Sequence, residues 1–199
     1  EYDGKPLESN QKYFWKVKVW DKDGNESAWS RIGSWQMGLL SPADWSGAKW
    51  IGFEDIADSL LLVPGVHGNG DNLGNVALKR TVIPYFRKEF PVKKKIEKAF
   101  VFVCGLGHYE LYVNGKIAGD HFLAPGWTDY RKTCLYNTYD ITDYLSDGPN
   151  VVAAIVGNGF YNVNRERYRK LVIANGAPKM ILNLKIHYND GFAETIISD

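Results

Sequence analysis

The sequence predicts an all-β fold, an antiparallel β-sandwich of the jelly-roll type, over most of its length. From residue 84 onward, short runs of alternating apolar and polar residues follow one another at roughly regular spacing. Tight-turn pairs such as Asn114-Gly115 separate the runs, because both residues tolerate the positive φ of a two-residue hairpin. No long pattern of helical period interrupts them. The expected strands cover residues 85–90, 99–104, 108–113, 116–118, 132–139, 151–156, 180–188 and 194–198.

The amino-terminal segment predicts a β-hairpin. Residues 13–20 alternate between an apolar face and a face that carries lysines, as a strand does. Residues 21–25 predict a turn, and residues 29–37 predict the second strand of the hairpin. An isolated hairpin is marginally stable at best. This one resembles the last two strands of a fibronectin type III sandwich, which needs about seven strands and about 100 residues. The resemblance implies that residues 1–38 are the carboxy-terminal part of such a domain and that the chain is a piece of a longer protein.

Residues 39–52 are predicted to be a linker and residues 53–199 the sandwich domain. Ser41-Pro42 breaks the strand pattern within the linker. Residues 54–75 contain several turn-forming steps and predict an irregular insertion. Residues 142–145 can form one helical turn, and Asp140 stands where a carboxylate caps backbone N–H groups.

Composition and charge exclude several classes of function. The 199 residues carry a formal net charge of +1, which gives no attraction to nucleic acid or to an anionic membrane. No apolar run is long enough to span a bilayer. The sequence begins with no signal peptide, so the location stays open between the cytoplasm and a periplasmic or secreted protein whose signal has been removed.

The two cysteines, Cys104 and Cys134, both fall in strand-like runs. Buried free thiols are the favoured interpretation, and a disulfide between them stays open. No CxxC pair or His/Cys cluster predicts a zinc site.

Two glycine-rich aromatic loops, residues 126–130 and 157–161, are the candidate binding elements. A pyranose can stack its apolar face on an aromatic ring while carboxylates and amides hold its hydroxyl groups. The alternative is that these rings plug one end of the sandwich or pack against a neighbouring domain. The candidate sugar-binding residues are Trp127, Asp129, Tyr130, Asn158, Phe160 and Tyr161.

Together, these segments resemble the amino-terminal region of bacterial α-L-rhamnosidases of glycoside hydrolase family 78. The motifs that carry the resemblance, in the expected order, are residues 13–37, 45–51, 84–90, 105–115 and 157–161. The resemblance implies the end of a fibronectin-like domain followed by a galactose-binding-like sandwich, both preceding the catalytic domain. It covers most of the chain except residues 55–81.

What the resemblance implies for function is an accessory, non-catalytic role. The family hydrolyses terminal α-L-rhamnose from glycosides by inversion, with its acid and base carboxylates on an (α/α)6 barrel that this chain does not match. No catalytic residue is therefore assigned, and the expected roles are packing against the missing barrel and help with the approach of rhamnosides. The alternatives are a carbohydrate-binding module for L-rhamnose and a purely structural fragment without a ligand.

Calcium is the one cofactor that the resemblance suggests, since some related sandwich domains bind rhamnose together with a calcium ion. Calcium takes about six to eight oxygen ligands at flexible distances. Asp71 and Asn72 in the inserted loop are the candidate ligands, although such a run more commonly forms a turn.

Overall fold

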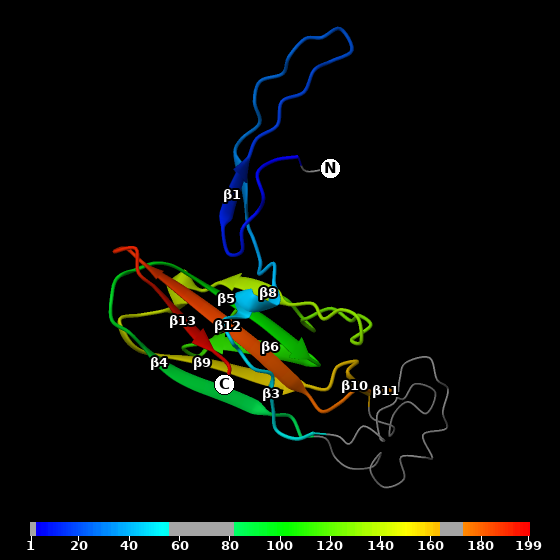
Figure 1. Cartoon of the computed structure of the whole chain (residues 1–199), viewed down its shortest axis with the longest axis vertical. Coiled ribbons are helices and arrows are strands. Elements are labelled where there is room, and N and C mark those ends of the chain that lie inside the picture. The colour runs from blue at the N-terminus through cyan, green and yellow to red at the C-terminus, as the bar shows by residue number, and fades with distance from the viewer. Residues whose placement is uncertain (1–2, 56–81, 164–172) are drawn as a thin grey trace. The chain divides into compact units, whose positions relative to one another are not determined.

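The computed structural model describes residues 3–55, 82–163 and 173–199 (Figure 1). Apart from short 3-10 turns, the regular elements in these ranges are β-strands, so the all-β prediction is confirmed. No helix in the described ranges combines the length and the apolar character needed to cross a bilayer. The chain divides into two compact units, Glu1–Trp45 and Ser46–Asp199. The boundaries at residues 38/39 and 52/53 remain a prediction.

In the first unit, a short ladder pairs β1 (Lys12–Trp15) with β2 (Gly33–Gln36), and η1 (Pro42–Trp45) ends the unit. These strands are shorter than the predicted ones because serine hydroxyls interrupt the ladder. The Ser27 hydroxyl accepts the N–H of Val19 at 3.1 Å, and the Ser30 hydroxyl accepts the N–H of Val17 at 2.9 Å. Side-chain oxygens thus replace the carbonyls that a regular strand would supply.

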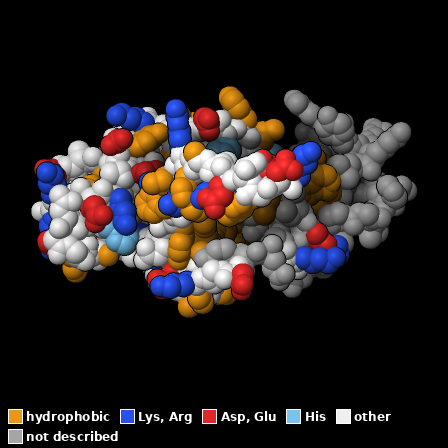
Figure 2. Space-filling view, turned by 90° about the horizontal axis from the view of Figure 1, so that it is seen from above, with side chains coloured by type: hydrophobic (Ala, Val, Ile, Leu, Met, Phe, Trp, Pro, Cys, Tyr) orange, Lys and Arg blue, Asp and Glu red, His pale blue; other side chains and the backbone are white. Residues whose placement is uncertain are grey.

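The first unit leaves many large apolar side chains in contact with solvent. Among its described residues, Leu39 is the one buried hydrophobic side chain. Apolar side chains also lie among charged ones on the face of the molecule shown in Figure 2. The exposed large apolar residues of the hairpin are Phe14, Trp15, Val17, Val19, Trp20, Trp29, Ile32 and Trp35.

We expect this hairpin to be the first segment lost in limited proteolysis. With so little apolar area buried in its own unit, local opening should cost little free energy. Trypsin digestion followed by mass spectrometry should therefore remove residues 1–38 before it cuts within the sandwich. Amide exchange in the hairpin as slow as that of residues 151–156 would contradict this expectation.

The second unit is a sandwich of two antiparallel sheets (Figure 1). The first sheet contains β3 (Ile51–Gly52), β5 (Ile96–Leu106), β8 (Asn137–Asp140), β12 (Lys179–Tyr188) and β13 (Ala193–Ile197). The second contains β4 (Tyr85–Val92), β6 (His108–Val113), β7 (Lys116–Ile117) and β9 (Gly148–Gly157). Their orders are β13-β12-β5-β8, with β3 also paired to β12, and β4-β9-β6-β7. A separate pair joins β10 (Asn162–Val163) to β11 (Ile173–Ala174).

The hydrophobic core lies between the two sheets. In β9 the buried residues Val152, Ala154 and Val156 alternate with half-buried ones, as a strand with one face in a core requires. They pack in one cluster with residues of the other sheet, including Leu184 and Ile186.

Both faces of β12 are buried in the first half of the strand. Ile181 and Asn183 on one face are buried, as are Leu182 and Leu184 on the other. Asn183 lies opposite Phe102 of β5, and the ring of Tyr136 packs edge-on against Phe102 with centroids 6.5 Å apart. The chain before β8 thus helps to cover the outer face.

Turn chemistry placed the hairpins correctly, but one predicted strand is largely a loop. Asn114 and Gly115 have φ of 50° and 78° between β6 and β7, and η4 (Thr142–Tyr144) begins where one helical turn was expected. The strand predicted at residues 132–139 is ordered as a strand only from Asn137. The Asp129 carbonyl accepts the N–H groups of Lys132 and Thr133, which turns the chain before β8.

Candidate functional site

Each of the two aromatic loops begins next to the first residues of β6, and this brings the loops to the same end of the sandwich. His108 at the start of β6 pairs with Gly157 at the end of β9, so the loop 157–161 begins there. On the other side, the N–H of Tyr109 donates to the carbonyl of Ala124 at 2.9 Å, just before the loop 126–130. One strand therefore positions both loops.

The aromatic cluster, defined as Trp127, Tyr130, Phe160 and Tyr161, contains one exposed stack. The rings of Trp127 and Phe160 are nearly parallel, 13° apart, with centroids separated by 4.5 Å. His108 meets the Phe160 ring edge-on at 6.3 Å, and burial lowers the pKa of this histidine, which favours the neutral ring. Trp127 remains 52% exposed and Phe160 37% exposed. The stack therefore offers aromatic surface to solvent while part of each ring is already covered.

Tyr130 and Tyr161 form the second ring pair of the aromatic cluster. Their rings meet edge-to-face with centroids 5.2 Å apart, and Tyr161 is buried. Burial raises the pKa of both phenols, so both stay protonated. Gly176 approaches Tyr161 so closely that a Cβ there would lie 2.8 Å from its hydroxyl. Tyr161 is therefore a packing residue of the cluster and offers no exposed ring face.

Two buried polar atoms in these loops have no hydrogen-bond partner within the described ranges. They are the hydroxyl of Tyr130 and the side-chain carbonyl of Asn158. Buried polar atoms are nearly always paired with protein or with water, so each unpaired one calls for an explanation. A hydroxyl group of a ligand, or a buried water, would supply the partner.

Asp129 is held by the protein itself. Its carboxylate accepts hydrogen bonds from Nε and Nη2 of Arg131 at 2.9 and 3.1 Å, and Lys132 Nζ lies 3.7 Å away. Hydrogen bonding from Arg131 lowers the pKa of Asp129, so the carboxylate is ionised at neutral pH. Both of its oxygens are engaged, and its first role is therefore to shape the loop. Asp140 likewise accepts the N–H of Thr142 at the start of η4.

No group of three or more His, Cys, Asp or Glu side chains stands ready to hold a metal ion in the part of the chain that the structure describes. Asp71 and Asn72 lie outside the described residues. At the aromatic cluster, Asp129 is paired with Arg131, which leaves its carboxylate poorly suited to a cation.

Cys104 and Cys134 are free thiols. Burial raises the pKa of Cys104 to about 12 and also raises that of Cys134. Both groups are therefore protonated and unreactive at neutral pH.

Sequence reasoning named the six candidate residues but missed two of their supports. Gly107 has a φ of 119°, and a Cβ there would lie 2.0 Å from the carbonyl oxygen of Gly157. His108 contacts Phe160 directly. The Gly105-Leu106-Gly107 run is the sequence feature that indicates the close approach of Gly107 to Gly157. No feature of the neighbouring sequence indicates the contact of His108 with Phe160.

The fold and the site define a β-sandwich module with an exposed aromatic stack. Residues 94–199 match the family model described as "Alpha-L-rhamnosidase N-terminal domain", and residues 1–41 match "Rha78A-like, N-terminal immunoglobulin domain". The chain belongs to the α-L-rhamnosidase N-terminal domain family, which confirms the resemblance found in the sequence.

Similar proteins are much longer than this chain. An α-L-rhamnosidase of Formosa agariphila is 36% identical over all of this chain, which corresponds to 21% of that protein. One from Alteromonas sp. (strain LOR) is 32% identical over the whole chain and 20% of its own length. The chain thus spans about a fifth of the curated relatives that it matches.

Solved structures show the same relation. The α-L-rhamnosidase from Dictyoglumus thermophilum is 38% identical, with a TM-score of 0.76 over 100% of this chain and 21% of that one. The enzyme from Aspergillus terreus is 30% identical, with a TM-score of 0.75 over 98% of this chain and 21% of that one.

Proposed function

We propose that this chain is the non-catalytic, amino-terminal accessory region of an α-L-rhamnosidase that hydrolyses terminal α-L-rhamnose from glycosides. The observation that carries the proposal is the match of the entire chain to about a fifth of longer α-L-rhamnosidases. In this proposal the remaining part of the protein holds the catalytic (α/α)6 domain, and the sandwich packs against it and shapes the approach of the rhamnoside.

The chemistry of the described residues supports an accessory role. Inverting glycosidases place two carboxyl groups about 6.5–9.5 Å apart, one as acid and one as base. At the aromatic cluster, the carboxylate of Asp129 is neutralised by Arg131 and Lys132, and its pKa is lowered. A general acid needs the opposite shift, since it must carry a proton near neutral pH.

We expect the isolated chain to release no p-nitrophenol from p-nitrophenyl α-L-rhamnoside. The measurement is absorbance over hours at high protein concentration, with a full-length α-L-rhamnosidase as the positive control. The Asp129→Asn variant serves to trace any activity that appears. Turnover by the pure chain that disappears in this variant would overturn the assignment as non-catalytic.

A second candidate function is binding of L-rhamnose at the aromatic cluster. It is favoured by the exposed Trp127–Phe160 stack beside the unpaired polar atoms of Tyr130 and Asn158. In this proposal the outer face of Trp127 covers the apolar face of the sugar, and Asn158 pairs with one of its hydroxyl groups. Asp129 contributes only if Arg131 releases one of its oxygens.

Titration of L-rhamnose against the chain, followed by tryptophan fluorescence, separates the two candidate functions. Saturable binding supports the carbohydrate-binding module, and its absence favours a role in packing alone. Repeating the titration with calcium and with EDTA tests the calcium-dependent form, to which the oxygens of Asp71 and Asn72 would contribute.

A further inference from the structure

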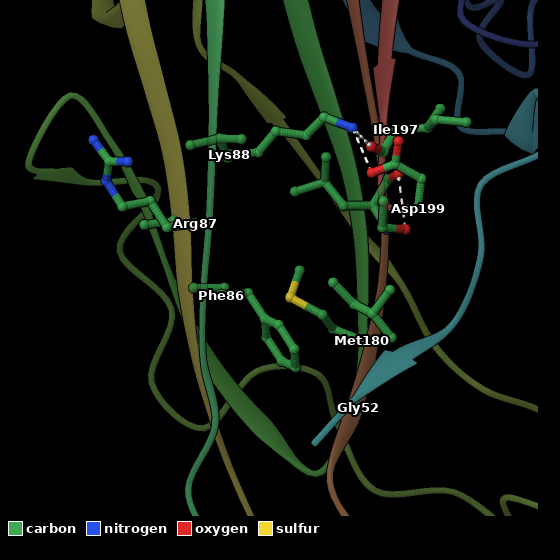
Figure 3. Close-up of a pocket in the computed structure, with 13 residues that line it drawn as sticks. Gly52, Phe86, Arg87, Lys88, Met180, Ile197 and Asp199 are labelled. Atoms are coloured by element: carbon green, nitrogen blue, oxygen red, sulfur yellow. Dashed lines mark hydrogen bonds and ion pairs between the residues drawn. The ribbon is translucent and has the colours of Figure 1, made fainter. Parts of the chain in front are cut away.

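A cavity of about 430 Å³ opens at the edge of the sandwich where β4 faces β3 and the end of β13 (Figure 3). This size lies within the range of about 300–1,000 Å³ that is usual for small-molecule sites. We propose that this cavity binds a small, uncharged aromatic molecule that carries a hydroxyl or carbonyl group. The proposal concerns a site separate from the aromatic cluster and does not depend on the proposed function.

The cavity exists because both sheets leave space at this edge. In the second sheet Phe86 of β4 pairs with Ala154 of β9, so a small side chain stands where a larger one would fill the gap. In the first sheet β13 covers β12 only from Asn183 onward, and β3 covers only its first two residues. Ser198 bridges the break by bonding to Leu182 and to Lys49.

The walls of the cavity favour an aromatic ring. Phe86 and Met180, from opposite sheets, point toward one another across the gap (Figure 3). A thioether sulfur makes favourable contacts with aromatic rings, and it adapts to irregular shapes. The remaining apolar wall consists of Ile51, Val152, Ala154 and Leu182.

One end of the cavity is polar and supplies a donor. The Lys88 side chain reaches from β4 toward the end of β13 (Figure 3), where its Nζ donates to the Ile197 carbonyl at 2.9 Å and to Asp199 Oδ1 at 2.6 Å. An ammonium group carries three N–H donors. The two contacts above leave one N–H for a ligand oxygen.

Charge decides between an uncharged and an anionic ligand. The Asp199 carboxylate already neutralises Lys88 at the mouth. Arg87, the other cation of the lining, points away from the cavity and pairs with Glu89 (Figure 3). A second carboxylate would have to share Lys88 with the Asp199 carboxylate and would be repelled by it, so a phenol fits this site better than a benzoate.

The test is a titration of the ¹⁵N-labelled chain with phenol, toluene and benzoate, followed by NMR. We expect phenol to shift the amides of Phe86, Ala154 and Leu182 with a dissociation constant of about 1 mM. Toluene should bind several-fold more weakly because it has no acceptor, and benzoate more weakly still. The absence of saturable shifts at these amides would overturn the proposal.

Two variants make the test specific. Ala154→Leu should fill the cavity and weaken phenol binding by about tenfold or more, while the exposed control Ala193→Leu should leave it unchanged. Lys88→Met should abolish the preference for phenol over toluene without closing the cavity. Phenol binding that is equal in Ala154→Leu and the parent chain, or a preference that survives in Lys88→Met, would contradict the site.

Discussion

Replacing Gly107 by alanine is expected to destabilise the sandwich unit by about 3 kcal/mol or more. Gly107 has a φ of 119°, and its Cβ would stand 2.0 Å from the carbonyl oxygen of Gly157. The strained φ and the clash with backbone act together, because neither chain segment can move without disturbing the pairing of β6 with β9. Thermal unfolding followed by circular dichroism should show a melting temperature lower by roughly 6–12 °C.

Gly115→Ala is the matched control for this prediction. Gly115 also has a positive φ, 78°, but a Cβ there would meet no atom within 4 Å. Only conformational strain remains, worth about 1–2 kcal/mol. If both variants lose the same stability, the approach of Gly107 to Gly157 is not tight, and the loop 157–161 is not held as described.

Truncation of Trp127 to alanine is expected to weaken L-rhamnose binding by about tenfold or more, which equals about 1.4 kcal/mol or more. An aromatic ring stacked on a flat ligand contributes about 1–3 kcal/mol in the case of nucleic-acid bases, and we expect no more for a pyranose. The fold should survive, since Trp127 is 52% exposed. Isothermal titration calorimetry of the parent chain and the variant measures the affinity for L-rhamnose, and circular dichroism of both shows whether the fold survives.

Phe122→Ala is the control for Trp127, because Phe122 is 96% exposed and takes no part in the Trp127–Phe160 stack. It should leave the affinity for rhamnose unchanged. An unfolded Trp127→Ala chain would show that Trp127 serves the core, as the alternative interpretation of these loops holds. A folded variant with unchanged affinity would place the sugar elsewhere, with the loop that contains Asp71 and Asn72 as the next candidate.

The local sequence pattern alone predicted the strands and turns correctly where neighbours in sequence are also neighbours in space. The period of two in residues 108–113 and the Asn114-Gly115 turn predicted β6 and its hairpin to β7, because strand alternation and positive φ are properties of a few consecutive residues. The same reasoning failed where a side chain competes with the backbone. Ser27 and Ser30 ended the first ladder early in this way. A backbone turn at the Asp129 carbonyl replaced the first residues of the strand predicted at residues 132–139.

The sequence by itself determined the all-β class, the hairpins and the family, and it named six candidate site residues. Only the tertiary structure decided how the side chains of those six residues pack. The stacking of Trp127 on Phe160 follows from the pairing of β6 with β9, which joins segments distant in the chain. The burial of Tyr161 and the cavity beside Ala154 arise in the same way, from the packing of sheets and loops. No local pattern encodes such contacts, because they depend on which strands become neighbours.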